Sequence, residues 1–90
     1  MPDSYRIELS PAAQRQARRL TSNDRRRVRD ALRGLVETPR TRGSVKLTGF
    51  ESVYRIRVGQ FRVVYEIHDD EHLVMVLRIA RRDEATYRQL

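Results

Sequence analysis

Two segments in the second half of the chain alternate between apolar and polar residues, and a short turn joins them. They are residues 53–58 and 61–67, and the Gly59-Gln60 pair between them is typical of a type II′ β-turn. Because side chains alternate along a strand, this hairpin gathers one set of apolar and aromatic residues on a single face: Tyr54, Ile56, Val58, Phe61, Val63 and Tyr65. The opposite face carries Arg55, Arg57, Arg62, Val64 and Glu66.

The first half of the chain predicts a strand followed by two helices. Residues 5–9 alternate as in a strand that points positions 5, 7 and 9 inward. Ser10-Pro11 supplies an N-cap and a proline at the first helical position, and Thr21–Asp24 can cap a second helix that Thr38-Pro39 closes. Apolar residues recur on one stripe of each helix, so we expect a helical hairpin packed on the sheet.

The remaining segments complete an α+β pattern. Val45–Leu47 predicts a brief edge strand, and residues 72–79 are apolar on both faces, as in a central strand buried between layers. Asp83 can cap a short terminal helix that carries Tyr87. We therefore predict one domain over residues 1–90, built from a small antiparallel sheet, an N-terminal helical hairpin packed on one face and a short C-terminal helix.

Composition and charge restrict the classes of partner. The 90 residues suffice for one modest core, and the chain has no cysteine, so disulfides and thiolate metal sites are excluded. The longest apolar run, Leu73–Leu77, is far too short for a membrane helix, and we expect a soluble cytoplasmic protein. The net charge of +7 and the pI near 11.0 favour nucleic acid or an acidic protein as partner.

The bias among the basic residues has two explanations. Of the 19 basic residues only Lys46 is a lysine. Arginine binds phosphate and carboxylate through two parallel hydrogen bonds, which suits RNA or an acidic partner. A GC-rich genome produces the same bias with no function attached, and composition alone leaves both explanations open.

Most enzyme templates are absent from the sequence. There is no Gly-rich phosphate loop, no His-Glu metal motif and no Ser/His/Asp grouping. His68 and His72 flank an acidic turn at the far end of the hairpin from the arginines, and solvated turn residues explain them better than general bases. Arg25, Arg29 and Arg33 form a basic stripe at helical spacing, which is usually a solvated surface.

The hairpin arginines are the strongest candidate site. Arg57 lies directly across from Arg62 in the predicted register, and like charges in that position repel. An anion should offset this repulsion: a nucleic-acid phosphate, an acidic partner chain or a carboxylate elsewhere in the fold. Arg81 and Arg82 would stand beside the cluster if residues 72–79 pair with the second hairpin strand, and Tyr87 could fold back over it.

These residues resemble the RelE/ParE superfamily of bacterial and archaeal toxins. The matching segments are Lys46-Leu47-Thr48-Gly49, Tyr54–Gly59, Phe61–Tyr65 and the terminal Arg81, Arg82 and Tyr87. For the RelE branch, the resemblance implies a sheet that binds mRNA in the ribosomal A site. It also implies cleavage by attack of a ribose 2′-hydroxyl on the adjacent phosphate, without metal or other cofactor.

The resemblance also implies roles for individual residues. Carrying the basic catalytic positions across gives Arg57, Arg62 and Arg81 with Tyr87 as the catalytic set, and Arg55, Lys46 and Arg82 as RNA-binding residues. Some RelE members have lysines where this chain has Arg55 and Arg57. An arginine is a very poor general base, so Arg57 is expected to stabilise the phosphorane or neutralise the nucleophile. Tyr87 either takes the 2′-hydroxyl proton or stacks on a base.

Three functions follow from the resemblance as alternatives. The favoured one is the toxin of a type II toxin–antitoxin pair that cleaves mRNA on the ribosome and is neutralised, in a hetero-oligomer, by an antitoxin covering the arginines. The second is a ParE-like inhibitor of DNA gyrase, and the third is a non-catalytic homologue that only binds its antitoxin. Joint presence of Arg81 and Tyr87 favours the nuclease, and no membrane partner is expected.

Overall fold

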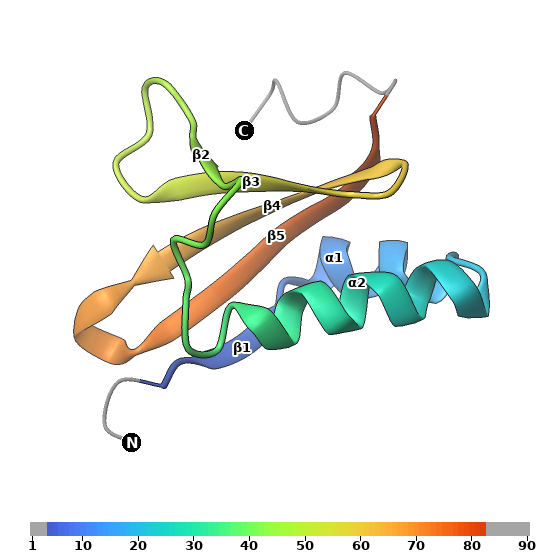
Figure 1. Ribbon diagram of the computed structural model, residues 1–90, viewed down its shortest axis with the longest axis horizontal. Coiled ribbons are helices and arrows are strands. Elements are labelled where there is room, and N and C mark those ends of the chain that lie inside the picture. Colours follow the sequence, from blue (N-terminus) through green and yellow to red (C-terminus); the bar gives the residue numbers. More distant parts are fainter. Residues whose placement is uncertain (1–3, 83–90) are drawn as a thin grey trace.

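The computed structural model describes residues 4–82 and shows a five-stranded sheet with two helices on one face (Figure 1). The strand order is β1-β5-β4-β3-β2. The elements in chain order are β1 (Arg6–Leu9), α1 (Pro11–Arg18), α2 (Ser22–Gly34), β2 (Val45–Lys46), β3 (Val53–Val58), β4 (Phe61–His68), the 3-10 helix η1 (Asp69–Glu71) and β5 (Leu73–Arg81). This arrangement confirms the predicted α+β class.

The β3–β4 hairpin has the predicted register. Ile56 pairs with Val63, Arg57 with Arg62 and Val58 with Phe61, all antiparallel. Gly59 has a φ of 59°, whereas Gln60 is not among the residues with positive φ. A type II′ turn needs a positive φ at its first central position only, and glycine adopts it without a Cβ clash. The turn therefore fixes which side chains share a face.

The core lies between the sheet and the helices. Val63 and Tyr65 of β4 are fully buried there, and Val28 and Leu35 from the helical hairpin pack in the same cluster. The Tyr65 hydroxyl donates a hydrogen bond to the Pro39 carbonyl oxygen at 2.7 Å, which satisfies its only buried polar group. The predicted inward face of the hairpin is thus confirmed.

The helices begin where the sequence places them. The Ser10 side chain accepts a hydrogen bond from the Ala13 amide at 3.1 Å, and Thr21 accepts one from the Asp24 amide at 3.2 Å. The second helix ends at Gly34, earlier than the predicted stop at Thr38-Pro39, because Leu35 already leaves the helix as its C-cap. Leu35 is fully buried, so the helix ends against the core.

The structure differs from the predicted fold in the direction of one strand, and one predicted helix lies outside the described residues. The sheet is mixed, because β1 runs parallel to β5, with Ile7 opposite Val74 and Leu9 opposite Val76. Alternation predicts which face a side chain occupies but not the direction of the neighbouring strand, so the antiparallel expectation was wrong for β1. The predicted C-terminal helix with Tyr87 lies outside the described residues. Within residues 4–82, no helix combines the length and the apolar character needed to cross a membrane.

Candidate nucleic-acid interface

The sheet face turned away from the helices carries two neighbouring rows of arginine side chains. The first row crosses the sheet from Arg57 of β3 to Arg62 of β4 and Ala80 of β5. Arg57 is exposed and Arg62 is half-buried. The repulsive pair predicted from the sequence therefore exists in the structure, and we call it the first arginine row.

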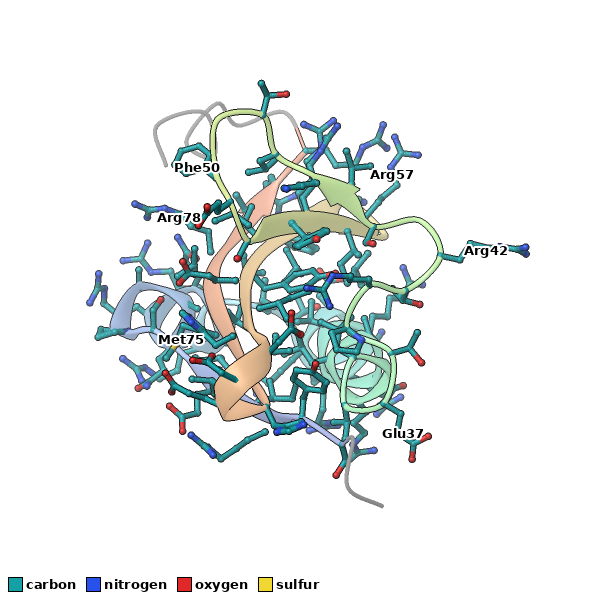
Figure 2. The ribbon with its side chains drawn as sticks, turned by 90° about the vertical axis from the view of Figure 1, so that its left-hand side faces the viewer. Glu37, Arg42, Phe50, Arg57, Met75 and Arg78 are labelled. Carbon is teal, nitrogen blue, oxygen red and sulfur yellow. The ribbon has the colours of Figure 1, made fainter. Side chains whose placement is uncertain are left out.

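The second row lies one pleat further along the same face. It crosses from Arg55 of β3 to Val64 of β4 and Arg78 of β5, with Val45 of β2 beside Arg55. In the view of Figure 2, Arg57 and Arg78 both lie above Met75. We call Arg55 and Arg78 the second arginine row.

Arg78 was not among the predicted site residues, because alternation along its strand predicts the wrong face. Val74 and Val76 face the core, so strict alternation would send Arg78 into the core as well. The register shifts between Val64 and Tyr65, where Val76 pairs with Tyr65 but Arg78 pairs with Val64, leaving Leu77 as the extra residue of a β-bulge. The bulge reverses the faces of β5 beyond it. A charged residue inside an apolar strand was the only signal in the sequence.

Among residues 4–82, no carboxylate pairs with Arg55, Arg57 or Arg78. Glu66 is the next residue on this face of β4 after Val64, and its Oε1 contacts His68 Nε2 at 3.1 Å. Of the three anions considered above, a carboxylate within the described part of the fold is therefore excluded for these three arginines.

Arg55 and Arg78 are also partly dehydrated. The Nε atoms of both side chains are shielded from solvent and have no hydrogen-bond partner. An unpaired buried donor on a charged group raises the free energy of the folded state. Binding of an anion to the exposed nitrogens of each guanidinium would offset that cost.

Arg81 and Arg82 lie at the end of β5, beside the β3–β4 turn, and both line one cavity. Arg81 pairs with Phe61, which faces the core, and its guanidinium carbon lies 5.4 Å from the centre of the Phe61 ring. Its Nη1 donates to Gln60 Oε1 at 3.1 Å. An open cavity of about 380 Å³ brings the two arginines together with the first row, and its lining residues are Gln60, Arg62, Arg81 and Arg82. Arg81 therefore lies near Arg62 at the end of the sheet, although its position in the strand does not belong to the face that carries the arginine rows.

Lys46 and Tyr87 do not extend this surface in the described structure. Lys46 is exposed on the edge strand β2, where it pairs with Tyr54 and so belongs to the helix side of the sheet. Tyr87 lies outside the described residues. The predicted site residues that the structure places together are thus Arg55, Arg57 and Arg62, and the cavity adds Arg81 and Arg82 beside Arg62.

The two histidines lie away from the arginine rows. His68 is at the end of β4, six residues from Arg62, which is about 20 Å along an extended strand. His72 follows η1 in a left-handed conformation with φ of 50° and stacks obliquely against Tyr5, their rings 5.3 Å apart. Within residues 4–82, no three His, Asp or Glu side chains cluster closely enough to hold a metal ion.

The predicted basic stripe on the second helix is exposed, and two of its three arginines also have partners within the protein. Arg25 donates hydrogen bonds to three carbonyl oxygens at the end of α1, those of Ala17, Arg18 and Leu20, at 3.0–3.3 Å. Arg33 lies 3.8 Å from Asp30, and Arg29 is exposed. Arg25 therefore caps the first helix while remaining exposed, as predicted for the stripe.

Comparison with known proteins adds a family to this geometry. The family model for the ParE toxin of the type II toxin–antitoxin system parDE matches residues 7–86. The chain belongs to the RelE/ParE toxin superfamily. The match covers both arginine rows, the β3–β4 hairpin and the helical hairpin.

Individual relatives place this toxin beside RelE. It is 32% identical over 85 residues to Toxin RelE of Mycobacterium tuberculosis, covering 93% of this chain and 87% of the relative. It is 26% identical over 84 residues to the mRNA interferase toxin RelE of Escherichia coli, covering 91% and 87% respectively. Among solved structures, the intact E. coli RelBE toxin–antitoxin complex contains a chain that matches with a TM-score of 0.80 and 25% identity, covering 90% of this chain and 100% of that one. The chain is a RelE-like type II toxin.

Proposed function

We propose that this toxin is an endoribonuclease that cleaves mRNA on the ribosome and thereby stops translation. The observation that carries the proposal is the pair of arginine rows, which concentrates positive charge on one rigid sheet face with no internal carboxylate beside Arg55, Arg57 or Arg78 among the described residues. The E. coli relative that bears the name mRNA interferase supports RNA as the polyanion.

The chemistry requires no metal. The 2′-oxygen of a ribose attacks the adjacent phosphorus, the bond from phosphorus to the 5′-oxygen breaks, and that oxygen leaves with a proton. The products are a 2′,3′-cyclic phosphate and a 5′-hydroxyl. Negative charge accumulates on the phosphorane between these events. Arg57 and Arg62, which pair across the hairpin, would stabilise that charge. Arg81 would approach the same phosphate from the sheet edge.

Proton transfer needs a group other than the arginines, which stay protonated at any physiological pH. We assign it to Tyr87, whose alternative role is to stack on a base. Tyr87→Phe keeps the ring and deletes the hydroxyl, so a large loss of cleavage indicates proton transfer. Near-normal cleavage by Tyr87→Phe with strong loss in Tyr87→Ala indicates stacking instead.

The same surface is the proposed docking site of an antitoxin. RelE relatives from E. coli and from the archaeon Pyrococcus horikoshii have been solved in complexes with RelB. An acidic or amphipathic antitoxin segment that covers the arginine rows would neutralise their charge and exclude mRNA from them. We therefore expect a hetero-oligomer in which bound antitoxin abolishes cleavage.

The direct test uses ribosomes programmed with a defined mRNA. Wild-type toxin should cut the mRNA within the codon in the A site, and naked mRNA of the same sequence should remain uncut. Products should end in a 2′,3′-cyclic phosphate and begin with a 5′-hydroxyl. Absence of cleavage on programmed ribosomes by folded wild-type toxin would refute the proposal.

A second function has a specific observation in its favour, because the family model that matches is that of ParE. A ParE-like toxin would inhibit DNA gyrase through protein contacts and perform no catalysis. Induced expression would then produce DNA breaks and an SOS response before translation falls. Double-strand breaks with intact mRNA would transfer support to this function.

A further inference from the structure

The distance between the two arginine rows is similar to the distance between successive phosphates of a nucleic-acid strand. Arg55 and Arg57 are two residues apart on β3, so their Cα atoms lie about 6.7 Å apart along the strand. Arg78 joins the row of Arg55, and Arg62 joins the row of Arg57. Successive phosphates along a single nucleic-acid strand are separated by a similar distance. Each row can therefore meet a different phosphate of one strand.

The second row has the shape of a clamp. Arg55 and Arg78 stand on β3 and β5 with the small, fully buried Val64 between them on β4. Two strand spacings separate their Cα atoms, roughly 9–10 Å, which long arginine side chains can bridge toward one phosphate. Val64 carries no polar group that would compete for the same anion.

The unpaired Nε atoms of Arg55 and Arg78 favour binding of an anion at the second arginine row. Both guanidiniums are partly dehydrated, and neither has a carboxylate within ion-pair distance among residues 4–82. Solvated arginines on α2, such as Arg29, have not incurred this desolvation cost. An anion bound at the second row therefore gains more from its charge than one bound on the helices.

We propose that Arg78, together with Arg55, binds the mRNA phosphate next to the one that is cleaved at Arg57 and Arg62. This inference rests on the proposed ribonuclease function and adds a positioning residue to it. By holding the neighbouring phosphate, the second row fixes the register of the strand, so the scissile phosphate reaches the first row with its 2′-oxygen in line. Arg78 does not contact the reacting atoms.

The test measures binding separately from cleavage. Ribosomes are programmed with mRNA whose A-site codon carries 2′-O-methyl groups, which block the nucleophile, and binding of labelled toxin is titrated. Arg78→Gln should weaken binding by roughly 10- to 100-fold, as expected for loss of a charge-assisted contact. Arg78→Lys should restore part of the affinity. Arg29→Gln, an exposed arginine on α2, should bind within about twofold of wild type.

Uncharged methylphosphonate linkages at single positions of the mRNA then identify the phosphate that Arg78 binds. With a methylphosphonate in place of the phosphate next to the scissile one, Arg78→Gln should cause no further loss, because its partner is already uncharged. With the methylphosphonate at the scissile position, the full loss should persist for Arg78→Gln and vanish for Arg57→Gln. Thermal unfolding of each variant in the absence of RNA separates a folding defect from a binding defect.

Each other outcome overturns a specific statement. Wild-type affinity in Arg78→Gln, or an equal loss with every methylphosphonate position, refutes the second row as a phosphate site and leaves the proposed ribonuclease intact. Loss of antitoxin binding without loss of ribosome binding assigns Arg78 to the antitoxin instead. Failure of wild-type toxin to bind programmed ribosomes removes the proposed function itself and this inference with it.

Discussion

At the scale of single residues, identical side chains have different surroundings and hence different roles. Arg55 and Arg78 are partly dehydrated and unpaired at Nε, Arg25 caps a helix, Arg40 pairs with Asp69 at 2.7 Å, and Arg81 lies over an aromatic ring. Composition reports only that arginine is abundant. The environment of each guanidinium decides whether its charge is available to an external anion.

A substitution in the first arginine row should affect cleavage much more than one on the helices. Arg62→Gln removes one preorganised contact to the phosphorane, and we expect cleavage of ribosome-bound mRNA to fall by roughly 10²–10³. Arg29→Gln removes the same charge from an exposed position on α2 and should change the rate less than about threefold. Equal rates for both variants would show that the first row is not the catalytic surface.

Substitutions of the two arginines at the end of β5 should differ in their effect on the melting temperature. Arg81→Ala loses the contact with the Phe61 ring and the hydrogen bond to Gln60, so it should lower the melting temperature as well as the cleavage rate. Arg82→Ala removes an exposed side chain and should lower only the cleavage rate. Thermal unfolding and single-turnover cleavage of both variants check this, and wild-type cleavage by Arg81→Ala would remove it from the catalytic set.

At the scale of elements, the helical hairpin is held by a contact between its two helices. Arg25 near the start of α2 donates to the carbonyl oxygens that end α1, where the helix dipole also favours a positive charge. Arg25→Ala should lower the free energy of unfolding by about 0.5–1 kcal/mol, while Arg29→Ala should change it less. Urea unfolding measures both. Cleavage by folded Arg25→Ala should match wild type, since the helix lies across the sheet from the arginine rows.

A second contact between elements joins three distant segments at the other end of the sheet. The Asp69 carboxylate in η1 accepts hydrogen bonds from the Tyr5 hydroxyl at 2.6 Å and from both terminal nitrogens of Arg40, which follows α2. Arg40 Nε also donates to the Tyr54 hydroxyl at 3.1 Å. The Arg40 and Tyr5 hydrogen bonds lower the pKa of Asp69 from 3.8 to about 2.

This pKa predicts a pH dependence of stability with a definite sign. The folded state holds Asp69 ionised more strongly than the unfolded chain does, so its contribution is complete above about pH 4 and is lost as the pH falls toward 2. Asp69→Asn lacks that contribution at every pH. Thermal unfolding of both proteins between pH 2 and pH 6 should show melting temperatures that converge at the acid end. A constant difference over that range would contradict the assignment.

At the scale of the whole molecule, the sheet order sets which regions open first. β4 and β5 each pair with strands on both sides, whereas β2 is a two-residue edge strand with both residues exposed. Native-state hydrogen exchange should therefore be slowest for amides of β4 and β5 and fastest, within the sheet, for β2. Protection of β2 equal to that of β4 would indicate that another element covers this edge. Arg62 and Arg78 lie on these two strands, and Arg55 and Arg57 lie on β3, which pairs with β4.

Much of the site was predictable because strand alternation and turn chemistry are local. Gly59-Gln60 set the register, and the register set the faces of Arg55, Arg57 and Arg62. The helix caps at Ser10 and Thr21 were predictable for the same reason. Arg78 was not, because one extra residue in β5 reverses its face, and nothing in the alternation of that apolar strand locates a bulge.

The sequence by itself determined the order of helices and strands within residues 4–82 and the inward and outward faces of the hairpin, since both depend on residues close together in the chain. Only the tertiary structure decided that β1 runs parallel to β5, that Arg25 caps the first helix, and that Arg81 lies over the Phe61 ring. It also decided that Arg55 and Arg78 flank Val64 without a carboxylate in reach among residues 4–82. These facts depend on which distant segments pack together, and a local pattern of apolar and polar residues is compatible with more than one such packing.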